Sequence, residues 1–400
     1  MLLPEGFYEG QKEIAVEEKI TFKRIGQGVF YLVLLIEIGI VIVDKSAYIN
    51  PIEGRLFQAT VLLCMIKIVM TKYSFKEWIV MAVFFVLGAL SYFATGRNEI
   101  VRVVAFVAAS KNVNLRTVLK ITFYTTLAGV ITLVILSLTG SLGHVFLETN
   151  YGRGGIEKRY CFGLGHPNAL HCMFWALMTL GIYLYWKKLK WYHCVVLEAA
   201  NAGLYLLTVS RTGVAVASVT VLIAMIFCIF PKLQEKKWVY VTGIVCCGVC
   251  VIFSIFVAIY GPGISLFAQI DKYLTGRIQW AYLDGGARVW SLFSVPEHMG
   301  YFDMGFIRLF YWYGIIPGIA YIAVKGVQLF YCMKKKDAAS FLVITMFVLY
   351  TVFEAHAISV YLARDYALLL MVGVWSEMFG LQGGEGYFWQ PQKYLKRTAQ

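Results

Sequence analysis

Residues 151–171, YGRGGIEKRYCFGLGHPNALH, are polar and rich in glycine, and they stand between two long apolar runs. Arg159 could bind a phosphate group here, because the planar guanidinium donates paired hydrogen bonds to phosphate oxygens. His166 or Asn168 could bind a substrate hydroxyl. Pro167 predicts that a helix begins at this point, because proline is favoured in the first helical turn. The alternative is a helix-entry turn whose polar side chains bind no ligand.

Two further arginines stand in short polar breaks of the sequence. Arg211 lies in SRTG (210–213), which joins two apolar runs with almost no loop. Desolvating an arginine at the membrane surface is costly, so Arg211 needs a partner. A ligand is the favoured partner, and Glu198 or lipid headgroups are the structural alternative. Arg277 lies in TGR (275–277), in a long polar connection.

Carboxylates stand near the ends of later apolar runs. Asp303 precedes a predicted helix that carries Arg308 one turn in, so Asp303 could cap that helix, contact a substrate, or do both. Glu354 ends one apolar run and Arg364 begins the next. Ionisable groups at membrane depth usually serve function or pair with one another, so a Glu354–Arg364 pair is the structural alternative to a functional Glu354. Other charges within apolar runs are expected to pair inside the bundle: Glu37, Lys67 and Glu198.

The composition indicates lipid as the solvent of this chain. Of its 400 residues, 60% are hydrophobic and 15% are charged, with a mean hydropathy of +0.69, whereas soluble domains carry about a quarter charged residues. We predict an all-α polytopic membrane protein with about twelve transmembrane helices. The expected spans are 28–44, 54–71, 78–95, 98–110, 118–139, 167–186, 192–209, 211–230, 238–260, 305–330, 339–357 and 362–380.

The lysines predict the orientation of these spans. They occur in alternate connections, which the positive-inside rule assigns to the cytoplasm together with both termini. Residues 1–27 are then a cytoplasmic tail, 28–382 a single transmembrane catalytic domain, and 383–400 a second cytoplasmic tail. The glutamate-rich start is not a cleavable signal peptide. The nine cysteines lie mostly in apolar runs, and neither a disulfide framework, a metal site nor a cofactor is expected.

The remaining connections face outward, and arginine predominates in them. Topology selection does not explain outward positive charge, so these arginines suggest recognition of a phosphate-bearing ligand at the outer leaflet. Two outward loops are long, about 140–166 and 261–304, and long loops in compact domains are usually functional. The second contains tryptophans, tyrosines and carboxylates, which suit stacking against sugars or form an interfacial aromatic belt. The outward arginines are Arg97, Arg153, Arg159, Arg211, Arg277, Arg288, Arg308 and Arg364.

Five motifs resemble the O-antigen polymerase and ligase family, especially the Wzy-like polymerases that make capsular polysaccharide or exopolysaccharide in Gram-positive bacteria. They occur in the family's order over most of the chain, although each is short. They are GRNEIVRVVAFVAASKN (96–112), YCFGLGHPNALH (160–171), TVSRTGVAV (208–216), TGRIQWA (275–281) and DMGFIRLFYWYGIIPG (303–318).

The resemblance implies a GT-C-like membrane glycosyltransferase that needs neither a nucleotide sugar nor a metal. Members of the family transfer a glycan from undecaprenyl diphosphate to another lipid-linked repeat unit. The implied partners are an undecaprenyl-diphosphate-linked oligosaccharide, membrane lipids, a chain-length regulator and a flippase. Nucleic acid is not an expected partner despite the net charge of +13. The implied location is the bacterial plasma membrane.

The resemblance also assigns residues. Arg159 and Arg211 match the family's diphosphate-binding arginines, and Arg277 matches the arginine of its TGR motif. Asn168 and Arg308 are further substrate-binding candidates. Ligases usually have a His-Asn pair where Asp303-Met304 stands, which argues against a lipid A ligase. The general base that activates the acceptor hydroxyl remains open among three residues: Asp303, Glu354 and His166.

Two other classes of protein fit part of the pattern. A transporter or flippase for lipid-linked oligosaccharide would carry charges near the bilayer midplane and two similar halves, whereas no internal repeat is visible and charge concentrates at the outward end. A glycan-binding receptor or assembly scaffold would have the same binding residues without catalysis.

Overall fold

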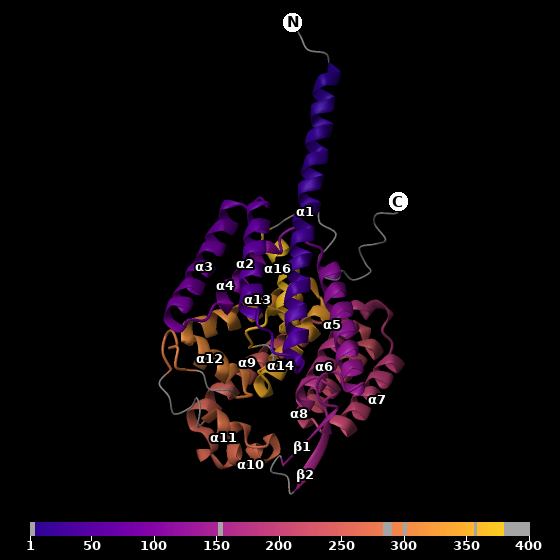
Figure 1. Ribbon diagram of the computed structural model, residues 1–400, viewed down its shortest axis with the longest axis vertical. Helices are drawn as coiled ribbons and strands as arrows, with labels where there is room; N and C mark the ends of the chain where they lie inside the picture. Colours follow the sequence, from indigo (N-terminus) through magenta and orange to yellow (C-terminus); the bar gives the residue numbers. More distant parts are fainter. Residues whose placement is uncertain (1–4, 151–154, 283–289, 299–301, 356–357, 380–400) are drawn as a thin grey trace.

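The computed structural model describes residues 5–150, 155–282, 290–298, 302–355 and 358–379 (Figure 1). The predicted C-terminal tail at 383–400, Arg153 and Arg288 lie outside the described residues. Helices make up most of the described chain, as the hydropathy pattern predicts.

Each predicted apolar stretch contains a helix or two consecutive helices. The helices are α1 (Glu5–Lys45), α2 (Glu53–Val69), α3 (Phe75–Thr95), α4 (Glu99–Ala109), α5 (Leu115–Leu138), α6 (Pro167–Leu184), α7 (Trp191–Thr208), α8 (Arg211–Ile229), α9 (Lys237–Tyr260), α12 (Gly305–Tyr313), α13 (Ile315–Lys335), α14 (Ala338–Phe353), α15 (Tyr366–Leu369) and α16 (Met371–Met378). Short 3-10 helices include η1 (Trp186–Lys188), η2 (Pro231–Glu235), η3 (Gly261–Gly263) and η5 (Leu362–Arg364).

Six helices of the described chain are long and apolar enough to cross a membrane, so the protein is a multi-pass membrane protein. These segments are Phe22–Lys45, Phe75–Thr95, Leu115–Leu138, Arg211–Ile229, Lys237–Gly263 and Ile315–Lys335. Their outer faces are apolar rather than polar. On α9, for example, Val245, Val249, Ile252 and Phe256 are exposed at helical spacing. A surface stripe of this kind suits contact with lipid rather than water.

The two long loops predicted to face outward lie at the same end of the bundle (Figure 1). The first carries strands β1 (Phe146–Asn150) and β2 (Ile156–Tyr160), and the second carries helices α10 (Ser265–Leu274) and α11 (Arg277–Ala281). The start of α1 extends beyond the opposite end (Figure 1). The positive-inside rule assigns the loop end to the outside.

The β1–β2 hairpin was not expected from the sequence, which predicts an all-α protein. The two strands are antiparallel and pair Leu147 with Arg159. Because side chains alternate along a strand, Arg159 points into the protein while Lys158 points outward and lies over the Phe146 ring, 3.7 Å from its centroid. The strands are too short and polar for an alternating pattern to predict them, but they direct Arg159 toward the bundle.

The predicted span 305–330 is broken at Gly314. Its backbone has φ +99°, and a Cβ here would lie 2.6 Å from the carbonyl oxygen of Leu292. The second outer loop folds back onto this break, because the Ile315 amide donates to the Ser291 carbonyl over 3.0 Å. Gly314 therefore permits the close approach that positions the loop segment 290–298.

Charges inside the bundle have polar partners. The Glu37 carboxylate accepts hydrogen bonds from Arg102 Nη2 over 3.0 and 3.1 Å, and Arg102 Nη1 donates to the Val360 carbonyl over 2.6 Å. Lys67 donates to the Thr71 hydroxyl over 2.6 Å. The Glu198 carboxylate accepts from Ser218 over 2.5 Å. The expectation of internal pairing thus holds for Glu37, whereas Lys67 and Glu198 bind neutral groups.

We predict that Gly314→Ala lowers the free energy of unfolding by at least about 2 kcal/mol, because it adds backbone strain and a clash with the loop. Gly326→Ala on α13 is the matched control, since its Cβ would meet no atom within 4 Å. This control should change stability by no more than about 1 kcal/mol. Thermal unfolding of the two variants in detergent measures the difference, and equal midpoints would contradict the role given to Gly314.

Candidate functional site

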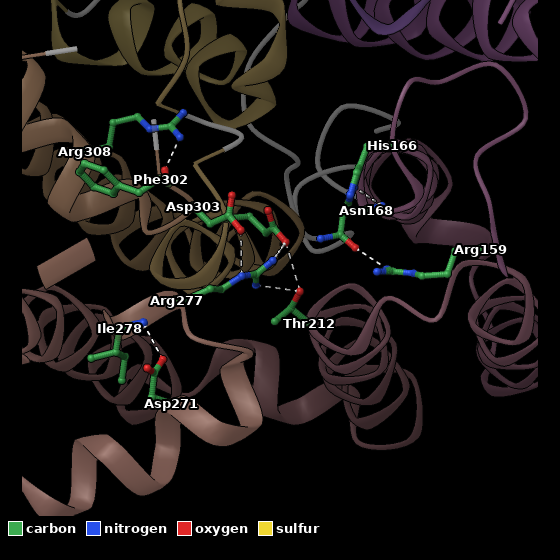
Figure 2. Close-up of polar contacts among 11 residues, drawn as sticks. Arg159, His166, Asn168, Thr212, Asp271, Arg277, Ile278, Phe302, Asp303 and Arg308 are labelled. Carbon is green, nitrogen blue, oxygen red and sulfur yellow. Dashed lines mark hydrogen bonds and ion pairs between the residues drawn. The ribbon is translucent and has the colours of Figure 1, made fainter. Parts of the chain in front are cut away.

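Arg277 lies at the centre of a polar cluster at the loop end of the bundle (Figure 2). Its Nε donates to Asp303 Oδ2 over 3.0 Å, and its Nη2 donates to Glu354 Oε1 over 2.6 Å. Its Nη1 donates to the Thr212 hydroxyl over 3.1 Å, and that hydroxyl donates to Glu354 Oε1 over 3.2 Å. The structure therefore brings together Arg277, Asp303 and Glu354, which were predicted separately.

Four segments that are distant in sequence supply this cluster. Arg277 begins α11, Thr212 lies in the first turn of α8, and Glu354 follows the last residue of α14. Asp303 lies in the loop before α12. The predicted capping of α12 by Asp303 is wrong, because the N-cap residue is Met304 and no side chain caps this helix start. The Asp303 carboxylate is thus available to Arg277.

Asp271 holds the start of α11 in place. Its carboxylate accepts from the backbone amides of Ile278 over 2.7 Å and Gln279 over 3.1 Å (Figure 2). The chain reverses just before, through left-handed conformations at Thr275 (φ +61°) and Gly276 (φ +79°). These contacts fix the direction in which Arg277 leaves α11.

The two carboxylates around Arg277 differ in exposure. The Asp303 side chain is 43% exposed, whereas that of Glu354 is 14% exposed. With both carboxylates ionised, the three side chains carry a formal charge of −1. Arg277 is therefore already neutralised, and Asp303 is the more accessible carboxylate.

Arg159, His166 and Asn168 form a second cluster, seen beside the first in Figure 2. Arg159 is only 2% exposed; its Nε donates to the Thr208 carbonyl over 2.6 Å and its Nη2 to Asn168 Oδ1 over 2.8 Å. His166 caps α6, because its Nδ1 accepts from the Asn168 backbone amide over 3.1 Å. The predicted helix start at Pro167 is confirmed.

The two clusters are electrostatically coupled through His166. Burial lowers the pKa of His166, and the charge of Arg159 lowers it further. Asp303 raises this pKa, while Arg277 and Lys45 lower it. His166 is therefore neutral at pH 7, and it lies within electrostatic range of both arginines.

The remaining predicted arginines have different surroundings. Arg211 begins α8, is exposed, and makes no hydrogen bond or ion pair within the part of the chain that the structure describes. Arg308 is 3% exposed, donates to the Phe302 carbonyl and lies 4.8 Å from the Trp312 ring centroid. Arg308 is thus placed to hold the residue before Asp303 rather than to meet a ligand directly.

The predicted alternative of a Glu354–Arg364 pair is wrong. Glu354 pairs with Arg277, and Arg364 pairs with Asp44 and donates to the Ser359 hydroxyl over 3.0 Å. The short sequence separation of Glu354 and Arg364 suggested proximity, but Arg364 lies against α1 instead. The alternative partner Glu198 for Arg211 is also wrong: the two described side chains form no ion pair, and Glu198 accepts from Ser218 and Asn201 instead.

Sequence reasoning missed a buried polar network beneath Arg159. His171 Nδ1 lies 2.9 Å from the Thr208 hydroxyl, and His171 Nε2 lies 2.9 Å from Asn201 Oδ1. Thr208 is also the residue whose carbonyl binds Arg159. His171 and Asn201 are fully buried polar residues within apolar runs, and that was the available signal.

No group of three or more histidine, cysteine, aspartate or glutamate residues that could hold a metal ion is found among the described residues.

A scan against protein-family models finds no match to this chain, and neither do searches of curated proteins and of solved structures.

We predict that Asp271→Ala weakens the α11 start by about 1–2 kcal/mol, the usual cost of removing a side chain that caps backbone amides. Hydrogen exchange of the amides at 277–281 should accelerate, since α11 loses its anchor. Lys272→Ala, which alters the exposed neighbour, is the control and should leave exchange unchanged. Unaltered protection in Asp271→Ala would show that other contacts fix Arg277.

Proposed function

We propose that this protein is a polysaccharide polymerase of the bacterial plasma membrane. It joins undecaprenyl-diphosphate-linked oligosaccharide repeat units at the outer leaflet. In this proposal the chain has about twelve transmembrane helices in a GT-C-like arrangement, with both termini cytoplasmic. One observation carries the proposal: an accessible carboxylate, Asp303, is oriented by Arg277 at the loop end of the apolar bundle. The buried Arg159 and the exposed Arg211 lie on adjoining segments.

Asp303 is the proposed general base. Its side chain is more exposed than that of Glu354, and Arg277 orients one of its oxygens. Glu354 uses its carboxylate to hold Arg277 and Thr212, and His166 uses Nδ1 to cap α6. Asp303 would accept the proton of the acceptor hydroxyl within hydrogen-bond distance. Arg277 and Glu354 act as positioning residues in this proposal.

The transfer reaction is balanced without a metal or a cofactor. The acceptor oxygen forms a bond to the anomeric carbon of the donor glycan as its proton passes to Asp303. The bond between that carbon and the diphosphate oxygen breaks, and the lipid diphosphate leaves with the electron pair. Fixed cations stabilise this leaving group, and such preorganised electrostatics contribute several kcal/mol in enzymes. Arg211 is the exposed cation for direct contact, and Arg159 acts through its field from a buried position.

The alternative of a transporter or flippase receives less support. The gap beside Glu37 and Arg102 has no room for a water molecule, whereas ligand sites usually measure about 300–1,000 Å3. The charges that line it are paired with each other, as expected for structural groups. At the loop end, by contrast, Asp303 and Arg211 keep exposed charge.

We expect Asp303→Asn to abolish elongation of lipid-linked repeat units by the purified protein in liposomes, with a loss of at least ~100-fold. Arg211→Lys and Arg277→Lys should each lower the rate about tenfold or more, because lysine cannot reproduce paired or multiple directional hydrogen bonds. Arg55→Lys, an exposed arginine at the start of α2, is the matched control and should elongate normally. Normal elongation by folded Asp303→Asn would refute the assignment of Asp303 as the general base. If the wild-type protein does not elongate the repeat units, the proposal that it is a polymerase is refuted.

The His166→Asn variant tests whether His166 or Asp303 is the general base. Asparagine is also a good N-cap, so the variant preserves the start of α6. Since the pKa of His166 is lowered, its removal should leave the pH–rate profile between pH 6.5 and 8 unchanged if Asp303 is the base. A loss of ~100-fold or more across this pH range would identify His166 as the base instead.

A further inference from the structure

The segment 208–213, which we call the α7–α8 turn, contacts both clusters of the candidate site. The Thr208 carbonyl accepts from Arg159 Nε over 2.6 Å, which connects the turn to the first loop. The Thr212 hydroxyl accepts from Arg277 Nη1 over 3.1 Å, which connects it to the second loop. A displacement of this turn would therefore disturb both arginines at once.

The α7–α8 turn is not held by its own side chains. Val209 adopts a left-handed conformation with φ +50°, which is unfavourable for a β-branched residue. Ser210 is the N-cap residue of α8, but its side chain makes no capping hydrogen bond. A backbone of this kind persists only where the surrounding structure holds it. Contacts from outside the turn must therefore fix its position.

His171 on α6 supplies such contacts. Its side chain is fully buried, and its ring lies against the turn, because a Cβ added to Gly213 would lie 2.7 Å from His171 Cδ2. Its Nδ1 lies 2.9 Å from the Thr208 hydroxyl, and its Nε2 lies 2.9 Å from Asn201 Oδ1. The absence of a side chain at Gly213 thus lets one ring contact the end of α7 and the first turn of α8.

The partners of His171 determine the role of each ring nitrogen. The Asn201 amide nitrogen donates to the Val214 carbonyl over 3.2 Å, so its Oδ1 accepts the hydrogen of His171 Nε2. In the neutral ring, Nδ1 then accepts from the Thr208 hydroxyl. Without His171 this hydroxyl still has the Leu204 carbonyl of its own helix as an acceptor, at 3.0 Å. Loss of the imidazole would therefore release the end of α7 from α6.

We propose that His171 is a positioning residue for the transfer reaction, because it holds the α7–α8 turn in the place from which the turn binds Arg159 and Arg277. This inference rests on the proposed function. Arg211 leaves the chain within the same turn, so the direction of the exposed cation depends on the same support. His171 acts through the turn and requires no contact with the substrate.

A second contact between α6 and α8 provides a matched comparison. Trp175 lies one helical turn after His171, farther from the loop end, and its Nε1 donates to the Thr220 hydroxyl over 3.0 Å. Trp175 and Thr220 are fully buried, as His171 is. This contact joins the same two helices without reaching the α7–α8 turn. Its loss therefore reports the effect of helix packing alone.

The test compares variants of the full-length protein in the liposome elongation assay, with kcat calculated per folded protein. His171→Phe keeps a ring but loses both hydrogen bonds, and His171→Asn keeps a polar atom near the position of Nδ1. Thr208→Val removes the hydroxyl and leaves the carbonyl that binds Arg159. Thr220→Val is the control. Thermal unfolding in detergent reports the stability of each variant.

We expect His171→Phe and Thr208→Val each to lower kcat about tenfold or more with little change in KM, because small misplacements of transition-state contacts are costly. The double variant should lose little more than either single variant, since both break one contact. His171→Asn should retain more activity than His171→Phe. Thr220→Val should unfold at a lower temperature, with kcat within about threefold of the wild-type value.

Several results would overturn the role given to His171. Wild-type kcat in folded His171→Phe or Thr208→Val would do so and leave the polymerase proposal intact; if His171→Phe does not fold, Thr208→Val decides. An equal fall of kcat in Thr220→Val would assign the effect to the packing of α6 on α8. If the wild-type protein does not elongate the repeat units, both proposals fail.

Discussion

The two-carboxylate contact of Arg277 is the interaction on which the candidate site depends. Arg277 binds Asp303 and Glu354, and Thr212 completes the cluster, so one guanidinium joins α8, α11, α14 and the loop before α12. A planar fork with several donors can hold two carboxylates in fixed directions. Removing it would leave two like charges close together in a partly buried place, which is strongly unfavourable. The cluster therefore fixes the geometry of the loop end as well as its charge.

Hydropathy predicted the helices well because lipid requires every backbone polar group to be bonded within the spanning segment. The same rule carries no information on irregular segments outside the lipid. The β1–β2 hairpin and the break at Gly314 were therefore missed, although both position the site. Gly314 permits close backbone packing against Leu292, which only the folded loop reveals.

In the candidate site, too, the sequence indicated some features and not others: it pointed to residues but not to their partners. Residue type and position singled out Arg159, Arg277, Asp303 and Glu354, because polar residues are costly beside lipid, and the structure places the last three in one cluster. Their partners could not be predicted. Glu354 lies ten positions from Arg364 in sequence, yet its partner Arg277 lies 77 positions away. Ion pairs at helix ends depend on how helices pack, and a single sequence does not contain that packing.

The cations at this end look alike in the sequence, but their different partners in the structure indicate different roles. Arg277 and Arg364 are matched by carboxylates, and Arg159 is bound to neutral acceptors in a buried position. A cation already matched by a carboxylate orients that carboxylate, whereas binding a phosphate would first require breaking the pair. In the proposed function, phosphate recognition at this end therefore favours Arg211, which is exposed and has no carboxylate partner among the described residues.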